Sequence, residues 1–189
     1  MGKKSKKREI IEWVILLAVA GTLYITGYHT EVIGLVQRAA LSTGLFRPDT
    51  EPESEINADY DFTLVNAAGR EIHFSEFKGQ RVFLNFWATW CPPCVAEMPD
   101  IQSLYEKTGQ KVAFVMISVD KNKFKAKEFV QNKEYDFPIY FLKSGTPSVY
   151  NARSIPTTYI ISPEGKIVGE RHGMAKYDSE EFRNFLLNL

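Results

Sequence analysis

The chain has 189 residues, a formal net charge of zero and a hydrophobic content of 44 %. This length is enough for one domain with a core of its own. The hydrophobic content excludes general disorder, and the balanced charge argues against a general nucleic-acid-binding protein. The charge is unevenly spread, because the first eight positions contain five basic residues: Lys3, Lys4, Lys6, Lys7 and Arg8.

An apolar run from residue 10 to residue 28 follows the basic segment, residues 1–9, and is interrupted only by Glu12. As a helix, the run would be about 28 Å long, close to the roughly 30 Å of a bilayer core. A basic segment before a single span predicts a cytoplasmic N-terminus and places the rest of the chain on the outer side. We therefore expect a single-pass anchor in the inner membrane, with the main domain in the periplasm or on the equivalent face.

A cleaved signal peptide is the alternative interpretation of this run. Ala18-Val19-Ala20 resembles a cleavage site. The apolar run continues for eight residues beyond it, which favours an uncleaved signal anchor. A lipoprotein is not expected, because no cysteine lies directly after the segment.

Residues 29–58 are expected to connect the anchor to the main domain. A helix is predicted over residues 31–46, because apolar residues recur on one side and Gly44 is a stop signal. This helix either lies at the membrane surface or beside the anchor, or is only a helical connection. Residues 48–61 contain six acidic residues, two prolines and no basic residue, which is typical of an exposed, extended spacer.

Residues 59–189 alternate between strand and helix patterns and are predicted to form one α/β domain. The domain begins with a hairpin over residues 60–74. A helix predicted at residues 121–133 exposes many lysines and is expected to point Phe124, Phe129 and Val130 inward. The other predicted elements are strands at 82–87, 111–119, 137–142, 157–162 and 166–171, and helices at 95–107 and 179–189.

Both cysteines lie between the strand at 82–87 and the helix at 95–107, as Cys91-Pro92-Pro93-Cys94. The free N–H groups and the dipole at the start of a helix stabilise an anion, here a cysteine thiolate. We expect Cys91 to be exposed and acidic, and Cys94 to be buried and to act as the resolving thiol. Pro92 and Pro93 stiffen this turn and remove N–H groups that could bind the Cys91 sulfur.

Non-catalytic uses of the cysteine pair fit the pattern less well. A permanent structural disulfide would close a four-residue ring, which removes almost no loop entropy from the unfolded chain. A zinc site needs two further ligands, and copper delivery would favour a C-x-x-x-C spacing with a partner histidine. The three histidines show no paired spacing that would complete a metal site: His29, His73 and His172. We therefore predict no metal and no cofactor.

The segment from Phe86 to Cys94, followed by Glu97-Met98-Pro99, resembles the membrane-anchored, TlpA/ResA-like branch of the thioredoxin superfamily. Residues 154–159, Ser-Ile-Pro-Thr-Thr-Tyr, look like the cis-proline segment of the same fold. The resemblance covers residues 59–189. It implies a thioredoxin fold, in which helices flank a central mixed sheet, with an added N-terminal hairpin and one transmembrane helix before it.

The resemblance also implies roles for residues around the cysteines. It implies that the Ile155–Pro156 bond is cis and that these two residues form an apolar wall beside Cys91, along which an extended substrate segment pairs. Trp90 flanks the active-site surface in this family, although rim packing explains it equally well. Glu97 is interpreted as an acid that tunes both thiols, the alternative being a favourable charge near a helix start.

Asn85 departs from thioredoxins proper, which have a buried aspartate at the matching position. An amide cannot shuttle protons. The departure therefore argues against the mechanism of cytoplasmic thioredoxins and moves the handling of the proton to Glu97.

These features predict a membrane-anchored thiol–disulfide oxidoreductase that cycles Cys91 and Cys94 between dithiol and disulfide. The resemblance favours reduction of protein disulfides outside the cytoplasm, for example in cytochrome c maturation or disulfide quality control. The expected partners are protein thiols and disulfides and a transmembrane thiol–disulfide electron donor, and no nucleic acid. The alternatives are a thiol peroxidase of the same fold and a non-enzymatic, membrane-tethered binding or chaperone module.

Overall fold

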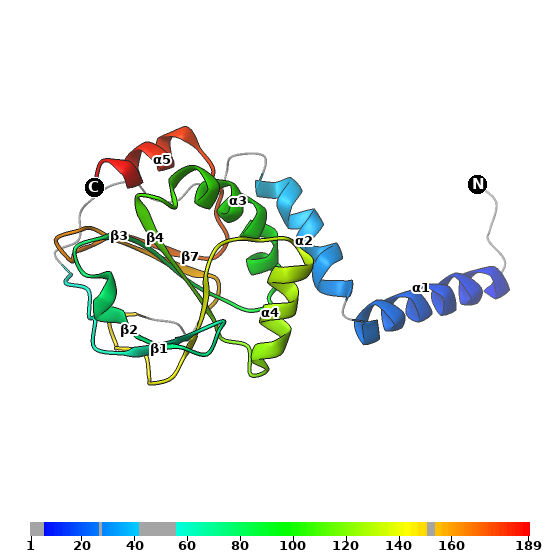
Figure 1. The fold of residues 1–189 in the computed structure, drawn as a ribbon. Helices are drawn as coiled ribbons and strands as arrows, with labels where there is room; N and C mark the ends of the chain where they lie inside the picture. The colour runs from blue at the N-terminus through cyan, green and yellow to red at the C-terminus, as the bar shows by residue number, and fades with distance from the viewer. Residues whose placement is uncertain (1–5, 27, 42–55, 151–153) are drawn as a thin grey trace.

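A seven-stranded mixed sheet forms the centre of the computed structural model, which describes residues 6–26, 28–41, 56–150 and 154–189 (Figure 1). The strand order is β2-β1-β5-β4-β3-β6-β7. The strands are β1 Thr63–Asn66, β2 Glu71–His73, β3 Arg81–Trp87, β4 Val112–Ser118, β5 Ile139–Leu142, β6 Thr157–Ile161 and β7 Ile167–His172. The helices are α1 Lys6–Thr26, α2 Tyr28–Leu41, α3 Pro92–Thr108, α4 Lys123–Asn132 and α5 Glu180–Leu187, with a 3₁₀ turn, η1, at Phe74–Phe77.

Strand β3 occupies the interior of the sheet because its sequence suits burial on both faces. Its side chains from Val82 to Trp87 are buried, and it pairs in parallel with β4 and antiparallel with β6. The prediction of a buried strand at 82–87 is confirmed, and so is the α/β fold with a mixed sheet. Because α3 follows β3 after a short turn, both cysteines lie at the carboxyl end of an interior strand.

Two apolar layers cover the faces of the sheet, because successive side chains of a strand point to opposite faces. Phe83 contributes to the layer beneath α3, α4 and α5. Val82 and Leu84 contribute to the opposite layer, whose aromatic residues include Phe62, Phe74, Tyr150 and Tyr159. Strands β1 and β2 form an antiparallel pair. This pair joins the rest of the sheet because β1 also pairs antiparallel with β5.

Helix α4 differs from its prediction in one side chain. Phe124 is 67 % exposed, so the expectation that it points inward is wrong. Ala126 is buried instead, and Phe129 and Val130 pack against the core as expected. Phe129 and Val130 lie three and four positions after Ala126 and share its side of the helix, whereas Phe124 lies two positions before Ala126 and therefore on another side.

Helix α1 occupies the segment predicted to be a transmembrane anchor, residues 10–28. Its first two turns carry charged side chains, which include Arg8, Glu9 and Glu12. In the part of the chain that the structure describes, no helix has both the length and the apolar character needed to cross a bilayer. The transmembrane anchor is therefore not confirmed.

The predicted connection between anchor and domain is described in part. Helix α2 forms where a helix was predicted at 31–46, begins at Tyr28 and packs against α3 (Figure 1). Residues 42–55, with most of the predicted spacer, lie outside the described residues. The end of that spacer is not free, because Ala58 N–H donates to the Gly165 carbonyl at 2.8 Å and Ile167 N–H to the Ile56 carbonyl at 3.0 Å. Contacts with the domain thus begin three residues before the predicted boundary.

Candidate active site

The two cysteines lie where the chain passes from β3 into α3. Cys91 is the N-cap residue of α3, and its sulfur accepts a hydrogen bond from the backbone N–H of Cys94 at 3.3 Å. Pro92 and Pro93 occupy the first two helical positions, where a missing N–H costs least. Cys91 and Cys94 form a disulfide, so the structure shows the oxidised state of the pair.

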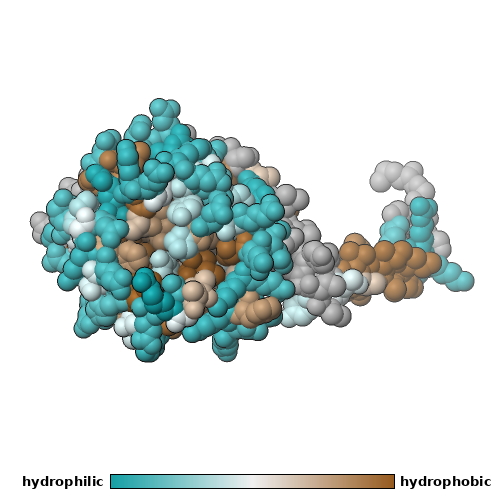
Figure 2. Space-filling model, in the orientation of Figure 1, coloured by the Kyte–Doolittle hydropathy of each residue, from teal (hydrophilic) through white to brown (hydrophobic). Residues whose placement is uncertain are grey.

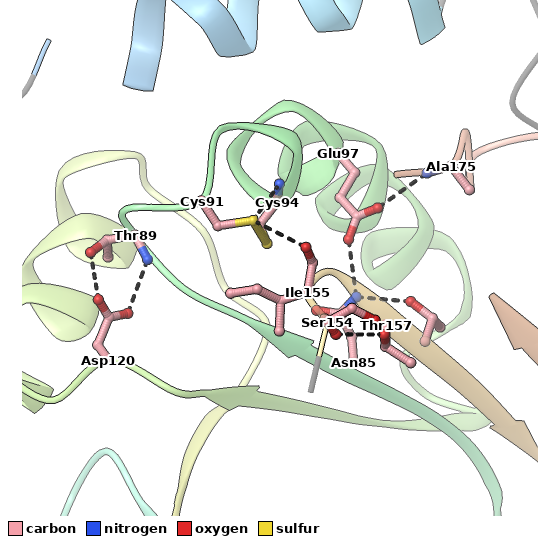
Figure 3. Close-up of a disulfide and its surroundings, with 11 residues drawn as sticks. Asn85, Thr89, Cys91, Cys94, Glu97, Asp120, Ser154, Ile155, Thr157 and Ala175 are labelled. Atoms are coloured by element: carbon pink, nitrogen blue, oxygen red, sulfur yellow. Dashed lines mark hydrogen bonds between the residues drawn. A yellow bond between two sulfur atoms is a disulfide. The ribbon is translucent and has the colours of Figure 1, made fainter. Parts of the chain in front are cut away.

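The loop before β6 contacts this disulfide. The Ile155–Pro156 peptide bond is cis, as the resemblance implied. The Ile155 carbonyl oxygen lies 3.7 Å from the Cys91 sulfur, and Figure 3 shows it pointing toward the disulfide. The Gly173 N–H, directly after β7, donates a hydrogen bond of 2.8 Å to the Pro156 carbonyl and holds the loop against the end of that strand. The structure therefore brings together the cysteine pair and the predicted cis-proline loop.

The reactive cysteine is more buried than its sequence position suggests. The expectation that Cys91 is exposed is wrong, because only 4 % of the residue is accessible. The cause is tertiary packing: the Ile155 loop covers the sulfur, and α2 lies on the neighbouring first turn of α3. Trp90 is 59 % exposed, and Pro92 and Pro93 are partly buried. These three residues form the accessible border of the cysteine pair.

Glu97 lies inside the protein, on α3 one turn after Cys94, and is 0 % exposed. Its carboxylate accepts hydrogen bonds from the Asn85 side-chain amide at 3.0 Å and from the Ala175 backbone N–H at 3.2 Å (Figure 3). Burial raises the pKa of Glu97 from its ordinary value of 4.5 to about 8, although both hydrogen bonds oppose this rise. The carboxyl is therefore mostly protonated at neutral pH. Among the described residues, no hydrogen bond joins it to either sulfur.

Asn85 connects Glu97 to the neighbouring strand β6. The Asn85 amide also donates to the Thr158 hydroxyl at 2.8 Å, and that hydroxyl accepts from the Tyr177 hydroxyl at 2.7 Å. Burial raises the pKa of Tyr177, so its hydroxyl remains a donor. Thr158 and Tyr177 were not predicted as site residues, because their connection to Asn85 depends on the register between β3 and β6 and on the path of the chain before α5.

A second carboxylate, that of Asp120, holds the turn that precedes Cys91. Asp120 is 8 % exposed and accepts hydrogen bonds from the Thr89 N–H at 3.0 Å and the Thr89 hydroxyl at 2.7 Å (Figure 3). It also accepts a hydrogen bond from the Ser118 hydroxyl at 2.9 Å. Asp120 was not predicted as a site residue, although its position in the sequence carries a signal. Asp120 comes shortly after β4, the parallel neighbour of β3, and the carboxyl ends of parallel strands meet at one edge of a sheet.

The Cys91–Cys94 pair can exchange its disulfide with the thiols of another molecule. This chemistry, together with the thioredoxin fold around it, defines a thiol–disulfide oxidoreductase. Within the described ranges, no group of three or more His, Cys, Asp or Glu residues could hold a metal ion. The AhpC/TSA family matches residues 57–169, so the chain belongs to that family.

Individual relatives place the chain among the ResA-like thiol–disulfide oxidoreductases. It is 31 % identical over 180 residues to the thiol-disulfide oxidoreductase ResA of Bacillus cereus, a match that covers 94 % of this chain and 95 % of that protein. It is 32 % identical over 167 residues to ResA of Bacillus subtilis, covering 87 % and 85 %. The crystal structure of StoA from Bacillus subtilis matches at a TM-score of 0.55 and 27 % identity, over 66 % of this chain and 94 % of that one.

Removal of the Asp120 carboxylate is expected to loosen the turn before Cys91. The Asp120→Ala variant leaves the Thr89 N–H without its acceptor, and a lost hydrogen bond to a charged group costs about 1.5–3 kcal/mol. We expect a lower free energy of unfolding and a shifted pH profile for alkylation of Cys91 in the reduced protein. Asp120→Asn retains one acceptor oxygen, so its free energy of unfolding is expected to lie between those of Asp120→Ala and wild type. An alkylation profile identical to wild type in Asp120→Ala would contradict the positioning role.

Glu97 is expected to make the stability of the oxidised protein fall as pH rises. Between pH 4.5 and about 8 the folded protein retains a proton that the unfolded chain releases. The free energy of unfolding should therefore decrease across this range, by up to about 1.4 kcal/mol per pH unit. Glu97→Gln has no such proton. We therefore expect its free energy of unfolding, measured in urea between pH 5 and 9, to depend less on pH than that of the wild type.

The same variant tests whether Glu97 acts in the reaction. If its proton participates, the pH profile of disulfide reduction should lose an inflection near 8 in Glu97→Gln. Glu128→Gln, on the exposed surface of α4, is the matched control and should leave both profiles unchanged. A wild-type rate profile in Glu97→Gln would return this residue to a structural role.

Proposed function

We propose that this protein reduces disulfides of protein substrates outside the cytoplasm through a cycle of Cys91 and Cys94. The observation that carries the proposal is the disulfide at the start of α3, whose Cys91 sulfur lies 3.7 Å from the carbonyl of the cis-proline loop. The similarity to enzymes named thiol-disulfide oxidoreductases supports the reaction type.

The cycle begins with both cysteines reduced. The Cys91 thiolate attacks one sulfur of the substrate disulfide, a mixed disulfide forms, and the other substrate sulfur leaves as a thiolate. The Cys94 thiolate then attacks the Cys91 sulfur, which releases the second substrate thiol and forms the Cys91–Cys94 disulfide. The substrate gains two electrons and two protons. A dithiol donor must return the same two electrons before the next turnover.

The supply of hydrogen bonds at Cys91 supports the reductive direction. A strongly oxidising pair needs a strongly stabilised thiolate. Here the Cys91 sulfur accepts a hydrogen bond from the N–H of Cys94, and Pro92 and Pro93 have no N–H to add. Once Glu97 loses its proton, its buried negative charge opposes formation of a thiolate on the same helix. The limited supply of hydrogen bonds favours the disulfide over the dithiol and makes the dithiol a good reductant, and the charge of Glu97 adds to this preference above about pH 8.

The proposal extends to the partners of this cycle. Substrates would be protein disulfides in an oxidising compartment, such as the haem-binding cysteine pair of apocytochrome c or a misformed disulfide. A transmembrane protein of the thiol–disulfide type would supply the electrons. Disulfides persist in such compartments, so a dedicated reductant is useful there.

We also propose that α1 attaches the protein to a membrane and that the domain faces the outer side. Figure 2 shows the apolar surface of α1 beyond the main body of the protein. Side chains along this helix are more than half exposed, among them Ile10, Trp13, Leu16, Leu17 and Tyr24. An exposed apolar surface of this extent marks an interaction site, and the basic segment before it favours a cytoplasmic N-terminus.

The redox cycle is tested by two cysteine variants and one equilibrium measurement. Cys91→Ser should abolish reduction of a protein disulfide, whereas Cys94→Ser should still attack and accumulate mixed disulfides. In the wild type, equilibration with a glutathione or dithiothreitol couple should give a potential close to the roughly −270 mV of thioredoxin.

Other outcomes would redirect the proposal. A potential near about −120 mV would indicate an oxidant instead of a reductant. Peroxide turnover that exceeds disulfide reduction would indicate a thiol peroxidase. Substrate binding that survives the Cys91→Ser and Cys94→Ser double variant would indicate a binding module.

Membrane attachment is tested by fractionation of cells that express the full chain. We expect the protein in the membrane fraction, and we expect Leu16→Lys with Leu17→Glu to release it. A reporter fused after Leu189 should be active only on the outer side. A wild-type protein found entirely in the soluble fraction, or a reporter active in the cytoplasm, would contradict this part of the proposal.

A further inference from the structure

Helix α2 lies directly on the catalytic end of α3. The closest approach is at Gly34, where an added Cβ would lie 3.6 Å from the Pro92 carbonyl oxygen, 3.6 Å from the Val95 side chain and 3.8 Å from the Ala96 nitrogen. Figure 3 shows the light-blue ribbon of α2 passing above the turn that carries both cysteines. A residue outside the thioredoxin-like sheet therefore lies next to Pro92, the residue immediately after Cys91.

The face of α3 that α2 covers is separate from the core of the domain. Val95 and Ala96 are 5 % and 1 % exposed, but neither belongs to the two apolar layers that cover the sheet. Leu41, at the end of α2, is 2 % exposed and is also outside both layers. Val95 and Ala96 lie where Gly34 of α2 meets α3. Displacement of α2 would uncover this apolar patch on the first turns of α3.

The contact between α2 and α3 is built to separate more easily than a core contact. Gly34 offers no side chain to interlock, and the buried Gln37 side-chain oxygen of α2 has no hydrogen-bond partner among the described residues. A buried unpaired polar atom lowers the stability of the packing. Burial raises the pKa of Asp100 on α3, and the positive charge of Arg38 on α2 is among the charges that oppose this rise. A positive charge of α2 therefore lies near enough to influence this carboxyl of α3.

We propose that α2 is a specificity element that occupies the α3 side of the approach to Cys91. An extended or unfolded substrate segment is narrow enough to pair with the Ile155 loop and approach the sulfur past the exposed Trp90 without disturbing α2. A folded protein surface is broader and also needs the apolar patch of Val95 and Ala96, so it reacts only after α2 is displaced. This inference rests on the proposed reduction of protein disulfides and defines its preferred substrates as extended segments.

Gly34 allows a direct test in the full chain. Gly34→Ala is the control, because its Cβ has ordinary van der Waals distances to every neighbour. Gly34→Leu adds three further carbons at the contact and should push α2 away from α3. Hydrogen exchange of residues 94–98 should then become faster in Gly34→Leu and remain at the wild-type rate in Gly34→Ala.

The kinetic measurement compares a disulfide in a short unfolded peptide with one on the surface of a folded protein. In wild type, kcat/KM should be higher for the peptide. In Gly34→Leu, kcat/KM for the folded protein should rise about tenfold, as when a competent state goes from a tenth of the population to all of it. The peptide should react at nearly the same rate in wild type, Gly34→Ala and Gly34→Leu.

A charge exchange provides an independent second variant if Gly34→Leu does not fold. Arg38→Glu places two carboxylates at the contact and should act like Gly34→Leu, and the double variant Arg38→Glu with Asp100→Arg should restore wild-type behaviour. In one outcome, a variant shows faster hydrogen exchange of residues 94–98 while the ratio of kcat/KM for the folded protein to kcat/KM for the peptide stays at its wild-type value. That result would overturn the proposed role of α2 in specificity. A wild type that reduces neither disulfide would instead overturn the proposed function itself.

Discussion

One buried amide joins the three elements on which the active site depends. Asn85 in β3 donates to Glu97 in α3 and to Thr158 in β6. The first contact fixes the helix that carries the cysteines, and the second fixes the strand that follows the cis-proline loop. An aspartate at this position would add a second buried carboxyl next to Glu97, whereas the amide supplies donors without adding charge. The neutral side chain thus holds both sides of the site together.

The electrostatics of the site follow from how little water reaches it. Removal of solvent keeps Glu97 protonated near neutral pH, and the prolines of the first helical turn limit the hydrogen bonds available to Cys91. The turn before Cys91 is different, because Asp120 retains donors from Thr89 and Ser118 around its carboxylate. One carboxyl thus keeps its proton near neutral pH, and the other holds the backbone of the turn before Cys91.

Features encoded by local sequence could be predicted well. The buried strand at 82–87, the helix after it and the cysteines between them follow from residue spacing, and the cis bond at Pro156 followed from the family resemblance. The prediction that Phe124 points inward was wrong, because the apolar residues of this short, lysine-rich helix allow more than one choice of buried side.

Features that depend on distant contacts could not be predicted in the same way. The burial of Cys91 depends on the Ile155 loop, 64 positions further along the chain, and the neighbouring first turn of α3 lies against Gly34 of α2, from a separate part of the chain. The contact of Asp120 with Thr89 needs the parallel pairing of β3 and β4. No periodicity within a single segment records such contacts, so the sequence identified the reacting atoms but not their enclosure.

The docked position of α2 also limits how far the dithiol can travel. This helix has 14 residues, about 21 Å of length, and it directly follows α1 in the chain. If α1 is held at a membrane, docked α2 acts as a short, stiff tether, and Cys91 samples only a thin layer of space above the lipid. A reductant embedded in that membrane then meets the disulfide at a high effective concentration, while substrates far from the surface remain out of reach.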